Sequence, residues 1–120
     1  MAKILIADDE PAVLQSISVL LRSRDHDVTA ISESAEAQRL LQEEQFDLLV
    51  TDIRMSPVDG MQLLQLAHDK HPDMPVIIIS AYSAESTQAQ GFELGCTAYI
   101  KKPFNIDEVL DTVAKALGEA

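Results

Sequence analysis

Short apolar runs alternate with amphipathic stretches along the whole chain, and this alternation restricts the fold more than any other feature. The runs are nearly continuous in Val, Ile, Leu and Ala, which is typical of strands buried on both faces of a sheet. They span Ile4–Ala7, Val28–Ile31, Leu48–Thr51, Val76–Ser80 and a weaker Ala98–Ile100. The pattern predicts an α/β fold.

Helical spacing of apolar residues fills the intervals between the predicted strands. Pro11 can open the first helix, and Pro72 ends the third. The shared faces of the first three helices consist of Leu14, Ile17, Leu20 and Leu21, of Ala37, Leu40 and Leu41, and of Leu63, Leu64 and Ala67.

The last two helices differ in strength. Segment 84–94 has a thin apolar face, and Gly91 within it costs about 1 kcal/mol relative to Ala. The segment from Ile106 to Leu117 follows the i, i+3, i+4, i+7 rule, and Asn105 can cap it with Glu108 three residues on. We therefore predict a soft fourth helix and a well-formed fifth.

Five strand–helix units in 120 residues imply a doubly wound parallel sheet with helices on both faces. We predict one domain over residues 1–120, which is long enough to bury a core. In such sheets ligands bind at the carboxyl ends of the strands. The residues directly after each strand are therefore the candidate functional residues.

The charge balance restricts the partners. Nine Lys and Arg stand against 20 Asp and Glu, for a net charge of −11, and the cations form no basic stretch. We therefore expect no nucleic-acid binding by this domain alone and no membrane association, but ready binding of a cation. The single Cys96 fits a reducing compartment, and the early acids Asp8 and Asp9 do not fit a signal peptide. A cytoplasmic location is expected.

Charged and hydroxyl residues follow four of the predicted strands. They are Asp8, Asp9 and Glu10 after the first strand, Asp52 after the third, Ser80 at the end of the fourth, and Lys101 and Lys102 after the fifth. Each alone is more often a turn or helix cap, but together they point to one site. Converging carboxylates need a cation such as Mg²⁺, a Lys can neutralise a phosphate, and an Asp can become an aspartyl phosphate.

The chain resembles the receiver domain of bacterial two-component response regulators over essentially its whole length. The residues that carry the resemblance are Asp8-Asp9-Glu10, Asp52 through Asp59-Gly60, Ser80-Ala81, and Gly95, Tyr99 and Lys102-Pro103-Phe104 in order. The resemblance implies a flavodoxin-like fold of five helices and five parallel strands in the order 2-1-3-4-5. It also implies a part in phosphorelay signalling, with a histidine kinase or phosphotransfer protein as partner.

The resemblance also implies roles for residues of the metal and phosphate site. Asp52 would be the phosphoacceptor. Mg²⁺, or Mn²⁺ in its place, would be bound by Asp9 directly, by Asp8 mainly through water or hydrogen bonds, and by Asp52 and the backbone carbonyl of Arg54. Lys102 would bridge to the phosphoryl group, and a cis bond before Pro103 would fix the direction of that lysine.

A switch is implied as well. Ser80, with its neighbour Ala81, would contact the phosphoryl group, and Tyr99 would swing inward behind Ser80. Arg54 and Tyr82 occupy positions that tune the lifetime of the phosphoryl group, and their bulk favours a longer lifetime. If two copies pair on phosphorylation, we expect the surface of the fourth helix, fifth strand and fifth helix to be used.

One segment departs from the pattern of the family. Met55-Ser56-Pro57-Val58-Asp59-Gly60 stands where the family commonly has Met-Pro, any residue, and Met-Asp-Gly, so the proline is one place late. Because Pro fixes its own φ and restricts the residue before it, the path of this loop stays open.

Three other functions fit the sequence less well. A phosphatase of the haloacid dehalogenase type needs an acid at position 54, which is Arg. A flavodoxin-like FMN carrier needs a Ser/Thr/Gly-rich loop after the first strand, where Asp8 and Asp9 stand instead. A degenerate receiver would lack one of the acidic, hydroxyl or lysine positions, and none is missing. We therefore predict a phospho-accepting switch that assists its own chemistry, not an enzyme in the turnover sense.

Overall fold

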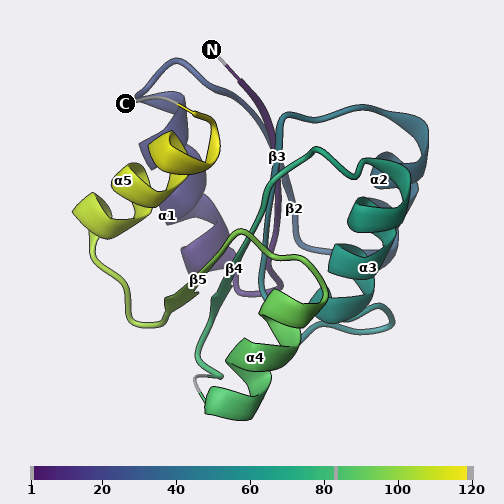
Figure 1. Ribbon diagram of the computed structural model, residues 1–120. Helices are drawn as coiled ribbons and strands as arrows, with labels where there is room; N and C mark the ends of the chain where they lie inside the picture. Colours follow the sequence, from purple (N-terminus) through teal and green to yellow (C-terminus); the bar gives the residue numbers. More distant parts are fainter. Residues whose placement is uncertain (1, 83, 119–120) are drawn as a thin grey trace.

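The computed structural model describes residues 2–82 and 84–118 and has five strands that alternate with five helices (Figure 1). The strands are β1 (Lys3–Ala7), β2 (Asp27–Ile31), β3 (Leu48–Thr51), β4 (Val76–Ser80) and β5 (Ala98–Lys101). The helices are α1 (Pro11–Arg22), α2 (Ser34–Glu43), α3 (Gly60–Lys70), α4 (Glu85–Glu93) and α5 (Ile106–Ala116).

All strands are parallel and lie in the order β2-β1-β3-β4-β5, which confirms the predicted fold class. The order reverses between β1 and β3, so the carboxyl ends of these two strands form the switch point where such sheets bind ligands. Their register pairs Ala7 with Thr51, which brings Asp8 and Asp52, the next residue of each strand, side by side.

Helices cover both faces of the sheet, with α1 and α5 on one face and α2, α3 and α4 on the other (Figure 1). Each face has its own core, because successive residues of a strand point to opposite sides. Ile4 and Ile6 belong to the core under α1 and α5, whereas Leu5 and Ala7 belong to the core under α2 and α3. The central strands β3 and β4 are buried along their whole length, as their continuous apolar runs predict.

Some helices begin at a side-chain cap that is visible in the local sequence, and others do not. Asn105 caps α5 by accepting a hydrogen bond from the Glu108 N–H, which is the Asn105 half of the predicted capping pair. A capping box that the sequence analysis did not identify begins α3, where Asp59 and Gln62 each accept the other's backbone N–H. The N-cap residues of α2 and α4, Glu33 and Ala84, make no side-chain capping bond.

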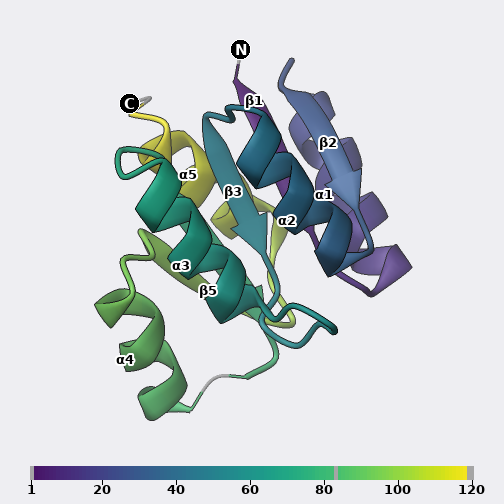
Figure 2. The same ribbon diagram turned by 90° about the vertical axis from the view of Figure 1, so that its right-hand side faces the viewer.

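Helix α4 stands apart from the other helices at the carboxyl end of the sheet (Figure 2). Gly91 is its one buried residue. A Cβ there would lie 3.0 Å from Ile78 Cδ1 and 3.3 Å from Cys96 Sγ. The glycine therefore lets this weak helix approach the strands closely, in addition to lowering its helix propensity as the sequence indicated.

Two peptide bonds in the described part of the chain are cis, Ser56–Pro57 and Lys102–Pro103. The second is the isomer that the resemblance implies. The first was not anticipated, and it lies in the β3–α3 loop whose path the sequence left open.

Candidate functional site

Two buried carboxylates lie at the switch point of the sheet. Asp8 is 2% exposed and Asp52 is 5% exposed, each directly after a buried strand. Their backbones continue the sheet, because the Asp8 N–H donates to Ile31 O and the Asp52 N–H donates to Ala7 O. Adjacent parallel strands thus fix both carboxylates at one edge, as the sequence predicted from topology.

Lys102, the residue directly after β5, contacts these acids through its ammonium group. Its Nζ lies 3.0 Å from Asp8 Oδ2, 3.0 Å from Asp52 Oδ2 and 2.8 Å from Glu10 Oε1. Although burial by itself would lower the pKa of Lys102, its hydrogen bonds to Glu10, Asp8 and Asp52 outweigh burial and raise that pKa. Lys102 is therefore a firmly charged ammonium that offsets the repulsion between the acids.

Asp8 occupies the least favourable position for a negative charge. Burial raises the pKa of its carboxyl, and the nearby charge of Asp52 adds to the effect. The Glu10 N–H, which donates to Asp8 Oδ1 at 2.8 Å, and the Lys102 ammonium act in the opposite direction. A divalent cation would relieve the remaining repulsion between these charges.

The structure groups the acids somewhat differently from the sequence interpretation. Carboxylate oxygens of Asp8, Glu10 and Asp52 lie within 4.8 Å of one another, so these three side chains could hold a metal ion. Asp9 is exposed and is not in that group. In the sequence, Glu10 stands out only as the third of three acids after the first strand. Its bond to Lys102 joins residues 92 positions apart, and no local sequence pattern reveals such a contact.

The β3–α3 loop, residues 53–59, follows Asp52, and its end at Gly60 packs back against the Asp52 backbone. Ile53 O accepts hydrogen bonds from the N–H groups of Met55 and Gly60, which closes the loop at its base. A Cβ on Gly60 would lie only 1.9 Å from Asp52 O, so a side chain there is incompatible with this return path. The start of α3 is thus packed directly against the backbone of Asp52.

Arg54 and Tyr82, predicted separately to tune the lifetime of a phosphoryl group, contact each other. The Arg54 guanidinium carbon lies 4.1 Å from the centroid of the Tyr82 ring, a cation–π contact between the β3–α3 and β4–α4 connections. Both side chains are exposed, so the pair lies at the outer edge of the site. The positions of the two residues were evident from the sequence, but their contact was not.

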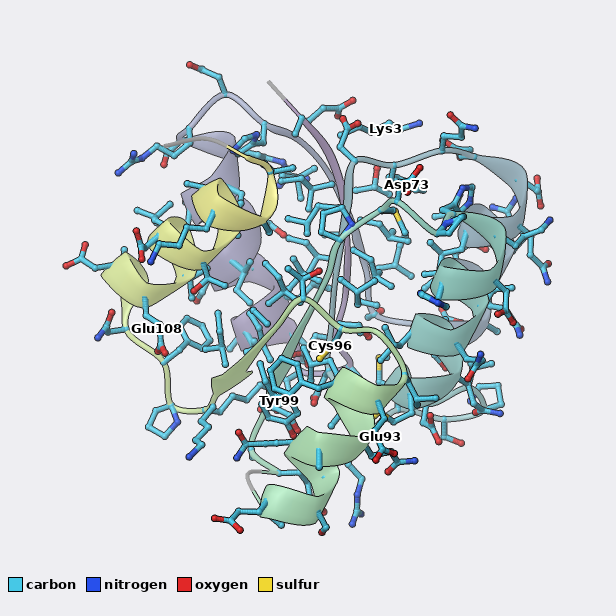
Figure 3. The ribbon with its side chains drawn as sticks, viewed as in Figure 1. Lys3, Asp73, Glu93, Cys96, Tyr99 and Glu108 are labelled. Carbon is cyan, nitrogen blue, oxygen red and sulfur yellow. The ribbon has the colours of Figure 1, made fainter. Side chains whose placement is uncertain are left out.

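Ser80 and Tyr99 meet at the backbone of Tyr82. Ser80 is fully buried, and its Oγ accepts the Tyr82 N–H at 3.0 Å. The hydroxyl of Tyr99 donates to the Tyr82 carbonyl oxygen. Figure 3 shows Tyr99 beside α4, near Cys96. Partial burial of the ring raises the pKa of the Tyr99 hydroxyl, so this group stays a proton donor at neutral pH.

Ala81 completes the set of predicted residues. It is exposed and lines a shallow pocket with Glu10, Lys102 and Pro103, beside the buried acids. The structure therefore brings Asp8, Asp52 and Lys102 into direct contact. It places Ser80 and Ala81 at the same edge of the sheet.

Comparison with known proteins identifies relatives along nearly the whole chain. Residues 4–114 match the response regulator receiver domain. The response regulator protein FleR of Pseudomonas aeruginosa is 34% identical over 119 residues, which are 98% of this chain and 25% of FleR. The DNA-binding regulator RpaA of Synechocystis is also 34% identical, over 98% of this chain and 49% of RpaA. The chain thus spans at most about half the length of these relatives.

Solved structures agree with this assignment. A CheY-like receiver domain from Methanospirillum hungatei superposes with a TM-score of 0.93 at 29% identity, over 98% of this chain and 94% of that one. The response regulator TrrA of Thermotoga maritima, solved with Mg²⁺ and BeF, gives a TM-score of 0.86 at 26% identity, over 97% and 99% of the two chains.

Within the described ranges 2–82 and 84–118, no helix combines the length and the apolar character that crossing a membrane requires.

Proposed function

The chain belongs to the response regulator receiver domain family, whose members are phospho-accepting signalling domains, and from that premise we propose that Asp52 accepts the phosphoryl group. The observation that carries the proposal is the buried Asp52 carboxylate, with Asp8 beside it and the Lys102 ammonium 3.0 Å from its Oδ2. The proposed donor is a phosphohistidine on a histidine kinase or phosphotransfer protein. The proposed location is the bacterial cytoplasm.

In the proposed transfer, an oxygen of Asp52 attacks phosphorus while the N–P bond breaks and its electron pair returns to the imidazole. Lys102 is placed to follow the transferred group, because its ammonium already bonds the acceptor carboxylate. Asp52 Oδ1 is oriented by the Ile53 N–H at 2.7 Å, which leaves Oδ2 on the side of the lysine.

The cluster of Asp8, Glu10 and Asp52 offers carboxylate oxygens of the kind that Mg²⁺ prefers together with waters and phosphate oxygens. We propose that Asp8, Asp9, Asp52 and the backbone carbonyl of Arg54 hold Mg²⁺, or Mn²⁺ in its place. The ion would supply positive charge to the transferring phosphoryl oxygens. Because the Lys102 ammonium also bonds Asp8 and Asp52, binding would require the lysine to share these two carboxylates with the ion.

We propose that Ser80 and Tyr99 convert phosphorylation into a change of surface. A phosphoryl group adds about two negative charges and three acceptor oxygens. The Ser80 hydroxyl can donate to one of these oxygens while its Oγ still accepts the Tyr82 N–H, so a shift of Ser80 toward the phosphoryl group would pull on the Tyr82 backbone. The carbonyl of Tyr82 holds the Tyr99 hydroxyl, so movement of this connection would reach β5 and α4.

The Arg54–Tyr82 contact supports the proposed long phosphoryl lifetime. Two large side chains in contact at the edge of the site would restrict the approach of an attacking water.

In the same proposal, a phosphodonor protein docks beside the site. An open groove between α1 and the β5–α5 connection, with Val19 and Ile106 each 59% exposed, offers it an apolar surface.

If phosphorylation makes two copies pair, we propose the α4–β5–α5 surface for the contact. Glu93 on α4 and Asp111 on α5 are exposed there (Figure 3 labels Glu93). Substituting either should weaken pairing and leave phosphorylation intact.

Intact-mass spectrometry after incubation with acetyl phosphate tests the chemistry. We expect one phosphoryl adduct on the native chain that requires Mg²⁺ and disappears in Asp52→Asn. An adduct that persists in Asp52→Asn would place the acceptor elsewhere. No adduct with any donor, including a histidine kinase, would favour a receiver that acts as a binding scaffold.

A further inference from the structure

Ser34, the first residue of α2, uses its side chain on a loop 24 residues away instead of on its own helix. It is 1% exposed, and its Oγ accepts the Val58 N–H at 3.0 Å. Serine near a helix start commonly caps that helix, yet the N-cap residue of α2 is Glu33, which makes no side-chain capping bond. The hydroxyl is thus committed to the β3–α3 loop.

The return arm of that loop is fixed by three consecutive N–H groups. The Asp59 N–H donates to Gln62 Oε1 at 2.9 Å, and the Gly60 N–H donates to Ile53 O at 2.8 Å. Both of these acceptors belong to the loop or to the helix that follows it. The Val58 bond is different, because its acceptor Ser34 lies on α2 and ties the loop to a separate element.

The anchored part of the loop is buried. Val58 and Met55 are each 8% exposed and belong to the core under α2 and α3. A Val58 N–H without an acceptor would therefore be a buried unpaired donor, which a folded chain avoids by shifting the backbone or admitting water. Either response would move the loop relative to Asp52.

Arg54 lies in the opposite arm of the same loop, between Ile53, whose carbonyl closes the loop at its base, and Met55, whose N–H donates to that carbonyl. Its guanidinium contacts Tyr82, and its carbonyl belongs to the proposed metal site. A loop fixed at its base by Ile53 O and at its far side by Ser34 has little freedom to turn the Arg54 peptide.

We propose that Ser34 is a positioning residue for the phosphoacceptor loop: its buried hydroxyl, by holding the Val58 N–H, fixes the Arg54 carbonyl for the metal ion. The effect on metal binding rests on the proposed function. The anchoring of the loop rests only on the hydrogen bond between Ser34 and Val58. Residues that orient a metal ligand from outside typically change metal affinity by about 10-fold or more when removed.

The test compares Ser34→Ala and Ser34→Thr with a matched control, Ser18→Ala. Ser18 is also a buried serine, 2% exposed, but its hydroxyl donates to Leu14 O within α1. Two readouts are taken by ¹⁵N nuclear magnetic resonance: hydrogen exchange of the Val58 amide without metal, and the dissociation constant of Mg²⁺ from amide shifts.

We expect Ser34→Ala to speed exchange of the Val58 amide and to weaken Mg²⁺ binding about 10-fold. Ser34→Thr, which keeps the hydroxyl, should restore both, and Ser18→Ala should change neither. Unchanged Val58 exchange in Ser34→Ala would overturn the anchor. Faster exchange with Mg²⁺ affinity within about twofold of native would overturn the positioning role.

The native chain separates this inference from the proposed function. If the native chain binds no Mg²⁺, the metal part of both proposals is wrong, and Val58 exchange in the metal-free variants still decides whether Ser34 anchors the loop.

Discussion

The two halves of the site differ in how firmly their elements are held by burial, capping and hydrogen bonds. On the β1–β3 side, buried strands end in Asp8 and Asp52, Lys102 bonds both, and α3 begins with a complete capping box. On the β4–β5 side, β4 and its Ser80 are buried as well, but β5 is only partly buried, and α4 has no side-chain cap and one buried residue. We infer that the acid half is fixed in advance and that the half containing Ser80 and Tyr99 is free to change.

This difference follows from what each half has to do. Holding like charges together requires a rigid frame, because a carboxylate that can move away from its neighbour will do so. A switch instead needs an element whose alternative arrangements differ little in free energy, and a helix with few buried contacts meets that need. Substitutions in the two halves should therefore differ in their effects.

Gly60→Ala should have the largest effect on stability, because it disturbs the close packing of α3 against Asp52 in the acid half. Its Cβ would fall 1.9 Å from Asp52 O, a backbone atom that cannot turn aside. We expect a loss of more than about 3 kcal/mol in the free energy of unfolding, above the usual cost of overpacking. Urea denaturation measures it.

Gly118→Ala is the control for Gly60→Ala. Gly118 has a φ of +76°, but no atom of the described residues beyond its chain neighbours lies within 4 Å of the position that a Cβ would take, so only backbone strain of about 1 kcal/mol is expected. Equal losses in the two variants would show that close packing against Asp52 is unimportant.

Lys102→Met should come next, since it removes the cation shared by three acids. We expect a loss of about 2 kcal/mol at pH 7 without metal, less than for a fully dry ion pair because Glu10 is open to solvent. Mg²⁺ should restore more stability to this variant than to the native chain. Denaturant midpoints with and without Mg²⁺ provide the comparison.

The matched control is Lys115→Met, which breaks an exposed pair with Asp111 on α5. Exposed pairs contribute less than about 1 kcal/mol, so a small change is expected. If Lys102→Met is no more damaging than Lys115→Met, the acid half does not depend on its lysine.

Gly91→Ala tests how α4 is held against the sheet. On helix propensity alone, alanine should stabilise the helix by about 1 kcal/mol. The new Cβ would crowd Ile78 and Cys96, so we expect a net loss of about 0.5 kcal/mol and altered shifts of the Tyr99 ring. The exposed Gln90→Ala serves as control. A stabilised Gly91→Ala would mean that α4 is not held by close contact with the strands.

Asp8→Asn should give the smallest effect, and its sign depends on pH. Burial raises the pKa of the folded Asp8 carboxyl above its ordinary 3.8, so folding favours the neutral form. Its contribution to stability is full below 3.8 and is lost as the pH rises through the raised value. Asp8→Asn should therefore slightly raise the unfolding temperature at pH 7 without metal.

That gain should shrink as the pH falls through the raised pKa of Asp8, because the native carboxyl then becomes neutral too. Asp9→Asn, on the exposed neighbour, is measured alongside as the matched charge-removing variant. A gain for Asp8→Asn that is constant from pH 7 to pH 3 would rule out this electrostatic origin.

The fold and the centre of the site could be predicted because their signals are short-range or topological. The apolar run Val76–Ser80 is a strand at the predicted bounds, and parallel order brings Asp8, Asp52 and Lys102 together whatever the loops do. The Asn105 cap of α5 was equally local.

Contacts that depend on the final packing could not be predicted. The Ser34–Val58 bond and the Arg54–Tyr82 contact join residues 24 and 28 positions apart in loops or at helix ends, where no periodicity applies. Gly91 was recognised as a poor helix former, but its close approach to Ile78 and Cys96 emerges only when α4 is placed on the sheet.

Native-state hydrogen exchange of α3 and α4 amides tests the difference between the two halves most directly. The helices are similar in length, 11 and 9 residues, and α3 has four buried residues against one in α4. We predict that α4 amides exchange on the order of 100-fold faster than α3 amides, through local opening that leaves β1 and β3 protected. Equal protection of α3 and α4 would contradict a rigid acid half beside a mobile switch half.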